Sequence, residues 1–325
     1  MSDVVIIHST KSGKTCAEEG MRRICEAVGE AFGNAKENAG NFIASVSSIE
    51  DVKKTVSELI AKKAPKLAIN GGDGFVSLFF NQFFREREKA GKDDYNPDVL
   101  FLKGGTGNAI SYCSNFRSNE EGLKCLQDGE YETEPLNVVE VISGEQKGLA
   151  HFVSFGADGE VLEMYSKQKK KGLIGYMWAV LRYAFSRRLY NIFSRNDANF
   201  DLKVEKNGEN IHTGRHEGGG VSTIPYIGYG FRSYPLAVAG KAHMRFVILG
   251  AILTPTIFKL TRWAFPKRPN RIIYDCIIKD DCVLDFSFDR KLHVQVAGDL
   301  WDKQQCVRVG YSKKRTINLV KKRAS

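Results

Sequence analysis

Short apolar runs alternate with helix-type patterns through the first 135 residues of the chain. The runs typical of buried strands are Val4–Ile7, Phe42–Val46, Lys66–Asn70 and Val99–Leu102. Helix-type patterns lie between them, over 15–31, Ser48–Lys63 and Phe75–Ala90, and further helical segments extend to about Gln127. Strands that alternate with helices favour a parallel sheet with right-handed crossovers. We therefore predict an α/β domain over residues 1–135.

After Glu134-Pro135 the pattern becomes one of short β-type runs separated by turn residues such as Asn207-Gly208. These runs are Leu136–Ile142, Gly148–Phe155, Asn199–Glu205, Glu209–Arg215, Met244–Leu249, Ile272–Ile278, Leu292–Val296 and Cys306–Val309. Such spacing predicts a mainly antiparallel, sandwich-like second domain over 136–310. His212, His216 and Glu217 stand beside three glycines but match no zinc-site spacing, and we expect a flexible loop there.

One helical pattern interrupts the second domain, from Gly172 to Phe193. Ile174, Trp178, Leu181, Phe185 and Leu189 recur in it at helical spacing. Its ends and other face carry the basic residues Lys169, Lys170, Lys171, Arg182, Arg187 and Arg188. A basic helix with a bulky apolar face suits a membrane surface, although the same stripe also suits packing on the sheet. Residues 252–265, with Trp263, form a second candidate of this kind.

Composition narrows the class of protein. A chain of 325 residues exceeds one typical domain, and its net charge of +10 attracts polyanions such as nucleic acid, an anionic membrane or a nucleotide. The seven cysteines form no Cys-x-x-Cys pair, which favours reduced cytosolic thiols over disulfides or zinc. Met1 leads directly into the first strand, and no apolar run approaches the roughly 18 residues of a membrane span. We expect a cytoplasmic protein, soluble or peripheral.

The first candidate site is the segment Gly71-Gly72-Asp73-Gly74-Phe75, between a buried strand and a helix. Glycines let a ligand approach the backbone closely, and amides at a helix N-terminus favour phosphate. The carboxylate of Asp73 can hold a metal bridge or order ribose and phosphate groups. A tight turn with Asp73 as the helix cap remains the alternative interpretation.

A second glycine-rich loop, Lys103-Gly104-Gly105-Thr106-Gly107-Asn108-Ala109, follows the Val99–Leu102 strand. Ligands of parallel sheets bind outside the carboxyl ends of the strands, where both loops would lie. The loop after the first strand contains Ser12-Gly13-Lys14-Thr15. It lacks the first glycine of a P-loop, because His8 stands at that position.

Together these motifs resemble the diacylglycerol kinase catalytic domain superfamily, which includes bacterial lipid kinases, sphingosine kinases and ceramide kinases. The family carries GGDGT and then GTGND or GSGNA at about this spacing, and an NPxSG segment in its first loop. The resemblance implies an ATP-dependent lipid kinase that uses Mg²⁺, with its site between the two domains. Residues 311–325, including Thr316–Val320, would then return to the first domain. The nucleotide-binding residues implied are Ser9, Thr10, Lys11, Ser12, Gly13, Gly71, Gly72, Asp73, Gly74, Phe75, Gly105, Thr106, Gly107 and Asn108.

The same resemblance implies residues for catalysis and for the lipid. Asp299 takes the place of the glutamate of the family's DGE motif and would be the catalytic base, working with Asp73. A plain hairpin turn is the alternative for Gly298-Asp299. Asp158 and Glu160 match a segment that meets the lipid head group in sphingosine kinases, and a plain turn is again the alternative.

Several family carboxylates are missing here. Ala109 replaces the aspartate of GTGND, and the segment from Pro235 to His243 lacks the acidic residues of the structural magnesium site that many bacterial members carry. We therefore predict no protein-built metal site. Two alternatives stay open: a pseudokinase that binds nucleotide or lipid, and an NAD kinase, which shares GGDG. The expected partners are a lipid substrate such as diacylglycerol or a sphingoid base, and an anionic inner-membrane surface, rather than nucleic acid.

Overall fold

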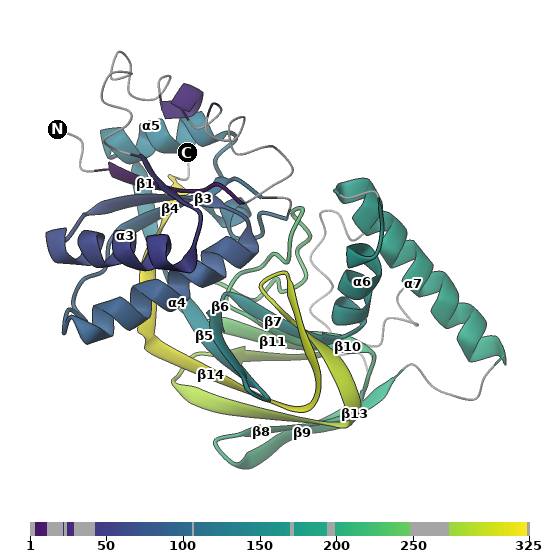
Figure 1. Cartoon of the computed structure of the whole chain (residues 1–325). Coiled ribbons are helices and arrows are strands. Elements are labelled where there is room, and N and C mark those ends of the chain that lie inside the picture. Colours follow the sequence, from purple (N-terminus) through teal and green to yellow (C-terminus); the bar gives the residue numbers. More distant parts are fainter. Residues whose placement is uncertain are drawn as a thin grey trace. The chain divides into compact units, whose positions relative to one another are not determined.

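The computed structural model describes residues 4–11, 22, 25–28, 43–105, 107–169, 172–193, 199–247 and 273–323. The chain divides into two compact units (Figure 1). Unit 1 comprises Met1–Asn137 with Lys314–Ser325, and unit 2 comprises Val138–Lys313. Unit 1 is α/β with parallel strands and unit 2 is mainly antiparallel β, so the predicted fold class is confirmed. The helix expected over 15–31 lies largely outside the described residues.

Among the described residues, the sheet of unit 1 contains a run of five strands in which each neighbouring pair is parallel. Its order is β2-β1-β3-β4-β14. The strands are β1 (Val4–Ser9), β2 (Ile43–Val46), β3 (Lys66–Gly71), β4 (Asp98–Lys103) and the last part of β14 (Asp299–Lys322). β14 joins through Asn318 and Leu319, which pair with Asp98 and Val99. The C-terminal segment therefore supplies a strand to the N-terminal sheet.

Helices cover both faces of this sheet. α5 (Asn119–Asp128) packs with Leu123 and Leu126 on one face, against a core that includes Leu100. On the other face, α4 (Asp73–Lys89) places the Phe80 ring 5.8 Å from that of Phe101. The sheet is therefore buried on both faces, which explains why its strands are continuous apolar runs.

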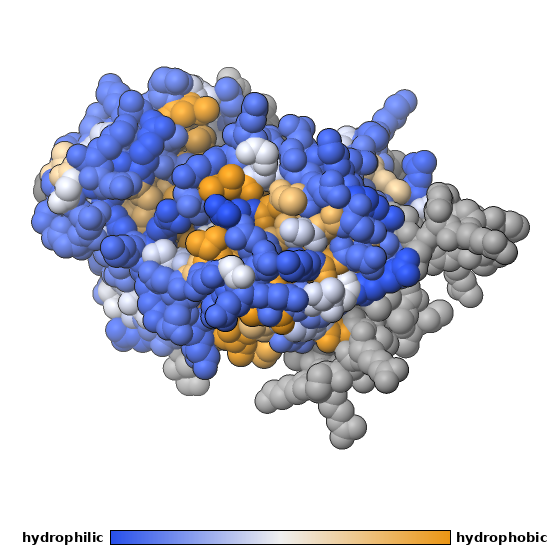
Figure 2. All heavy atoms as spheres, turned by 90° about the horizontal axis from the view of Figure 1, so that it is seen from below, coloured by the Kyte–Doolittle hydropathy of each residue, from blue (hydrophilic) through white to orange (hydrophobic). Residues whose placement is uncertain are grey.

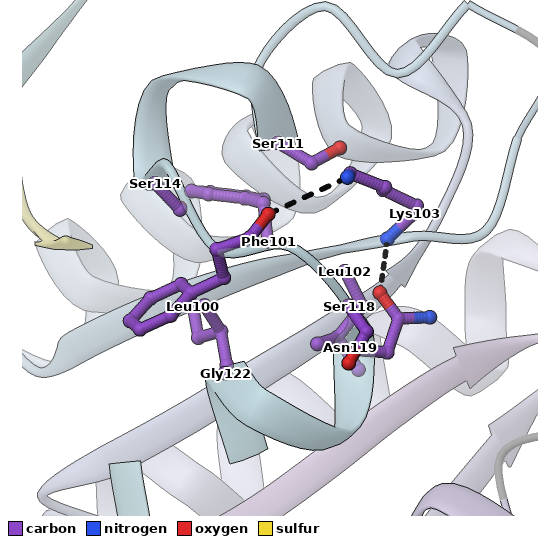
Figure 3. A pocket seen from close by; sticks show the side chains of 10 residues that line it. Leu100, Phe101, Leu102, Lys103, Ser111, Ser114, Ser118, Asn119 and Gly122 are labelled. Atoms are coloured by element: carbon purple, nitrogen blue, oxygen red, sulfur yellow. Dashed lines mark hydrogen bonds between the residues drawn. The ribbon is translucent and has the colours of Figure 1, made fainter. Parts of the chain in front are cut away.

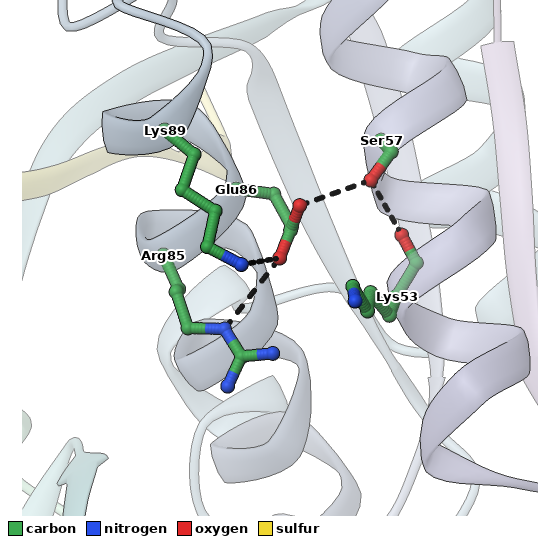
Figure 4. Close-up of polar contacts among 5 residues, drawn as sticks. All are labelled: Lys53, Ser57, Arg85, Glu86 and Lys89. Atoms are coloured by element: carbon green, nitrogen blue, oxygen red, sulfur yellow. Dashed lines mark hydrogen bonds and ion pairs between the residues drawn. The ribbon is translucent and has the colours of Figure 1, made fainter.

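α3 (Ile49–Lys62) lies beside α4 and begins with a capping box, in which Ser48 and Asp51 bond reciprocally. Glu86 of α4 joins the two helices (Figure 4). Its carboxylate accepts a hydrogen bond of 3.3 Å from Ser57 of α3 and pairs with Lys89 at 3.1 Å. This hydrogen bond links α3 to α4, the helix that begins at the first glycine loop.

Unit 2 is built from antiparallel strands in the order β12-β11-β10-β7-β13-β14, with β8–β9 and β5–β6 as attached hairpins. Phenylalanine rings from several strands fill its core, among them Phe155, Phe246 and Phe286. The strands are β5 (Tyr131–Ser143), β6 (Gln146–Ala150), β7 (Phe152–Gly156), β8 (Phe200–Lys206), β9 (Glu209–His216), β10 (Gly218–Ser222), β11 (Ala242–Val247), β12 (Ile273–Ile278), β13 (Cys282–Val296) and β14.

The flexible loop expected around His212–Gly220 is wrong, because this segment forms β9 and the central strand β10. β10 runs between β7 and β11, and its glycines admit close neighbours. A Cβ on Gly220 would lie 2.0 Å from the carbonyl oxygen of Val153. His212 and His216 of β9 meet each other at 2.7 Å between their Nε2 atoms. Among the described residues, no group of three or more His, Cys, Asp or Glu side chains is arranged to hold a metal.

In the described part of unit 2, a second helix precedes the helical segment that the sequence predicted. α6 (Ala157–Ser166) contacts β7, β10 and β13, and α7 (Leu173–Phe193) packs along α6 (Figure 1). The alternative in which the stripe of α7 packs on the sheet is wrong, because Trp178 is 64% exposed. No helix within the described ranges is both long and apolar enough to span a bilayer. The face in Figure 2 is mostly hydrophilic, with apolar residues in separate patches.

Candidate nucleotide and catalytic residues

Three neighbouring parallel strands of unit 1 end at one edge of the sheet. In the register of β1, β3 and β4, His8 lies beside Asn70, and Asn70 lies beside Leu102. The loops that follow Ser9, Gly71 and Lys103 therefore leave the sheet at the same edge. This is the edge at which parallel α/β sheets bind their ligands.

α4 starts at Asp73, shortly after β3, and no side chain caps its N-terminus. The N-cap residue is Gly72, which offers no side-chain acceptor to the first turn. The first amides of a helix have no partner within the helix, and the helix dipole adds partial positive charge there. Gly72 is in extended conformation, and Val76 donates its amide to the Gly72 carbonyl at 3.0 Å. Asp73 is the only acidic residue of the first turn.

The two glycine loops fit together backbone to backbone. A Cβ on Gly105 would lie 2.3 Å from the Cα of Gly72, and a Cβ on Gly104 would lie 2.6 Å from the amide nitrogen of Gly71. A Cβ on Gly71 would lie 2.2 Å from Cδ1 of the Phe75 ring. Side chains at these positions would separate the loops, so the glycines are required by mutual contact within the protein itself.

Asn108 closes the second loop on itself. Its Oδ1 accepts the Gly105 amide at 2.8 Å, and its Nδ2 donates to the Gly105 carbonyl at 2.8 Å. Asn108 adopts a left-handed φ of 52°, which asparagine tolerates better than most residues. The predicted binding residues Gly105 and Asn108 therefore shape the loop. Thr106, between them, lies outside the described residues.

Two buried polar side chains meet at the ends of β1 and β3. They are not among the site residues predicted from the sequence. Asn70 Nδ2 donates to His8 Nδ1 at 2.8 Å, and both side chains are more than nine-tenths buried. Burial lowers the pKa of His8 and so favours the neutral ring. Because an amide nitrogen only donates, the bond from Asn70 assigns the proton of a neutral ring to Nε2. Within the described ranges, that Nε2 and Asn70 Oδ1 have no hydrogen-bond partner. The sequence signal was a polar residue at the end of each of two apolar strands.

The first loop is anchored to the sheet. The amide of Thr10 donates to the Val46 carbonyl of β2 at 3.0 Å, and its hydroxyl donates to the same oxygen at 3.2 Å. Ser9 is buried and Lys11 is exposed. Ser12 and Gly13 lie outside the described residues. Lys11 is thus the predicted residue of this loop whose charge reaches solvent.

Asp299 lies in unit 2, at the first position of β14. Val296 and Asp299 pair across a hairpin whose two central residues, Ala297 and Gly298, have φ of 47° and 90°. Gly298 and Asp299 therefore belong to the hairpin turn that the sequence analysis left open, and the turn presents Asp299 at the surface. Desolvation by the surrounding protein raises the pKa of its carboxyl. A raised pKa makes a carboxylate a better proton acceptor than an ordinary aspartate, so a position in the turn is compatible with a role as base.

Asp158 and Glu160 lie in the first turn of α6, not in a plain turn. Gly156 provides the φ of 70° at the junction, and Gly159 lets the helix approach His293 of β13, whose Cβ lies 2.6 Å from the position of a Gly159 Cβ. Burial raises the pKa of Asp158 to about 6, partly offset by a hydrogen bond from Ser154. At neutral pH this carboxyl is therefore mostly ionised, with a small protonated fraction.

A small cavity lies beside β4 and α5. It is lined by residues that include Leu100, Lys103, Ser114 and Asn119 (Figure 3). Its volume of about 10 Å³ holds about one water molecule, not a nucleotide. Ser114 Oγ is buried without a hydrogen-bond partner among the described residues. A water here would satisfy that hydroxyl.

The chain shares its fold with solved structures from Bacillus anthracis str. Sterne. One assigned to the diacylglycerol kinases aligns with a TM-score of 0.67 and 16% identity, over 97% of this chain and 96% of that chain. A second aligns with a TM-score of 0.64 and 17% identity, over 98% and 97%. A third diacylglycerol kinase structure gives 0.60 and 15%, over 97% and 96%. No protein-family model matches the sequence, and no curated protein matches it. The fold predicted from the glycine motifs is confirmed.

Proposed function

We propose that this protein is an ATP-dependent kinase that phosphorylates a hydroxyl group of a lipid. One observation carries the proposal: two glycine-rich loops interlock at the open N-terminus of α4, at the strand ends of a sheet whose fold matches diacylglycerol kinase structures. The comparison supports the fold, and the geometry of the loops supports nucleotide binding. The lipid substrate and its transfer chemistry are our inference.

The residues of unit 1 suit a triphosphate. The first-turn amides of α4, at a helix end that no side chain caps, give phosphate oxygens hydrogen-bond donors. Lys11, exposed on the neighbouring loop, supplies positive charge. Gly71, Gly74, Phe75, Gly107 and Asn108 shape the same loops in this proposal.

The carboxylate of Asp73 could hold a magnesium ion together with a bound nucleotide. Mg²⁺ is usually held by one or two carboxylates together with substrate phosphates, and Asp73 is an acidic side chain at the open helix end. When bound, the ion would neutralise charge on the phosphates.

Phosphoryl transfer needs little covalent chemistry from the protein beyond positioning and a group that accepts the hydroxyl proton. We assign proton acceptance to the Asp299 carboxylate, whose raised pKa makes it a better base than an ordinary aspartate. We assign the lipid head group to Asp158 and Glu160 at the start of α6. A partly ionised Asp158 can accept a hydrogen bond from a hydroxyl or an amine.

The test is transfer of label from γ-phosphate-labelled ATP to diacylglycerol, a sphingoid base and NAD in parallel, with and without Mg²⁺. Label in a lipid that depends on Mg²⁺ supports the proposal. Label in NAD alone would replace it with NAD kinase. Binding of ATP or lipid without transfer to any acceptor would identify a non-catalytic binding protein, which the missing family carboxylates keep as the second candidate.

A further inference from the structure

α7 carries a continuous apolar stripe that the described residues leave uncovered. Trp178 and Phe185 are 64% and 66% exposed, and Ile174 is 71% exposed. Leu173 and Leu181 add to the same exposed set. Ile174, Trp178, Leu181 and Phe185 follow the spacing i, i+4, i+7 and i+11, so they line one side of the helix. Scattered exposed apolar residues need no explanation, but a contiguous group marks an interaction surface.

The opposite side of α7 is firmly packed, which fixes the direction of the stripe. Ala179 and Tyr183 are buried against α6, in a cluster with Val161. The Tyr183 hydroxyl donates to the buried Glu217 at 2.8 Å. At the start of the helix, Gly172 donates its amide to the Tyr165 hydroxyl at 2.8 Å. The outer stripe is therefore not a core face that lost its partner, because the helix already has one.

The charged residues of α7 itself have one sign. The 21 residues of α7 contain three arginines and no acidic residue. Arg182 is exposed and lies four positions after Trp178. Lys169 is exposed just before the helix, and the sequence continues with Lys170 and Lys171, which lie outside the described residues. An anionic surface meets such a helix with both apolar and electrostatic attraction.

We propose that the outer face of α7 is a docking surface for an anionic lipid bilayer. The helix would lie along the membrane plane, with Trp178 and Phe185 inserted at the head-group boundary and Arg182 extended to the lipid phosphates. A second copy of the chain fits this face less well. Two-fold contact would bring the same basic residues of both copies together, and like charges across an interface oppose association.

This docking goes beyond phosphoryl transfer and does not depend on it. The docking proposal concerns how the protein reaches a bilayer. It uses none of the residues assigned to the nucleotide, to the catalytic base or to the lipid head group. A failure of docking and a failure of the kinase proposal are therefore distinguishable by experiment.

The test compares two double variants of the full chain. Trp178→Ala with Phe185→Ala removes the two large rings and keeps strong helix formers. Ile277→Ala with Val283→Ala is the control, since both residues are exposed apolar side chains of unit 2 outside α7. Binding is measured by co-sedimentation with vesicles of phosphatidylcholine plus phosphatidylglycerol, and with phosphatidylcholine alone. Circular dichroism melts confirm that each variant is folded.

We expect the α7 variant to bind the anionic vesicles at least tenfold more weakly, a change of about 1.4 kcal/mol, and the control to bind like wild type. Added salt should weaken the wild-type interaction. Spin-labelled lipid should quench the fluorescence of wild type more than that of Trp178→Phe. Equal binding by wild type and the folded α7 variant would overturn the proposal. A wild-type dimer that the α7 variant loses, without vesicle binding, would assign the face to a second copy instead.

Discussion

Replacement of Gly105 by alanine tests whether the two glycine loops depend on direct backbone contact. The added Cβ would lie 2.3 Å from the Cα of Gly72 and 3.0 Å from its amide nitrogen. Both neighbours are backbone atoms, so no side-chain rotation relieves the clash. Ordinary contact begins at 3.4 Å, and the loops must therefore separate by roughly 1 Å, a displacement that can cost about 100-fold in catalysis.

The expected result follows from that displacement. Overpacking typically costs about 1–3 kcal/mol, and here the cost falls on the α4 N-terminus, where we place the phosphates. ATP affinity, measured by titration calorimetry with Mg²⁺, should fall at least tenfold, and turnover about 100-fold. Thermal unfolding should shift only moderately, because the loops lie outside the main core.

Gly310→Ala is the matched control. Its Cβ would meet nothing closer than Glu140 at 3.8 Å, and its backbone does not adopt a left-handed φ. We expect this variant to bind ATP and unfold like wild type. If Gly105→Ala also kept wild-type ATP affinity, the contact between the loops would have no part in nucleotide binding, and the proposed site would be refuted.

Four further variants test individual assignments. Asp73→Asn keeps the side-chain volume and should lower turnover at least about 100-fold without changing the melting temperature; wild-type turnover would remove Asp73 from the mechanism. Asp299→Ala should lower turnover roughly 10²–10⁴-fold with ATP affinity intact. In the wild type, the acid limb of the pH profile of turnover should lie above the ordinary aspartate pKa. Normal turnover by the Asp299→Ala variant would place the base at another residue. Asn108→Ala loses both bonds to the second loop and should weaken ATP binding about tenfold by calorimetry, whereas unchanged affinity means that the loop holds its shape without them. Because the pKa of Asp158 is raised to about 6, the free energy of unfolding should fall by at most about 3 kcal/mol as pH rises from about 4 to about 6. Urea melts of Asp158→Asn over the same pH range should lack this dependence. An identical pH dependence in the variant would exclude Asp158 as its source.

The sequence was sufficient for the α/β sheet because local pattern and tertiary environment agree there. Apolar runs such as Lys66–Asn70 are buried on both faces, and the glycines that follow them mark the strand ends. The helix predicted from Ser48 is also present, since the bonds that cap its start are local.

Unit 2 departs from the prediction where glycine serves packing instead of turning the chain. Gly218–Gly220 resembled a loop, yet these residues form part of a central strand because their neighbours approach too closely for side chains. Gly156 and Gly159 suggested a turn and concealed the start of α6. Such close approaches depend on partners distant in the sequence, which a local pattern does not reveal.

The candidate site shows the same division. The glycine loops and Asp73 could be recognised from sequence, whereas the His8–Asn70 pair could not, since it joins residues 62 positions apart. Helical spacing revealed the apolar stripe of α7 but gives the same pattern for a buried and an exposed face. Only the structure, with Trp178 turned away from α6, distinguishes the two.

Transfer of labelled γ-phosphate from ATP into chloroform-extracted lipid, by wild type and by Asp73→Asn side by side, tests the central claim most directly. We expect Mg²⁺-dependent label in the lipid phase for wild type and a loss of at least about 100-fold for the folded variant. Absence of lipid label from a wild-type protein that binds ATP would contradict the kinase assignment.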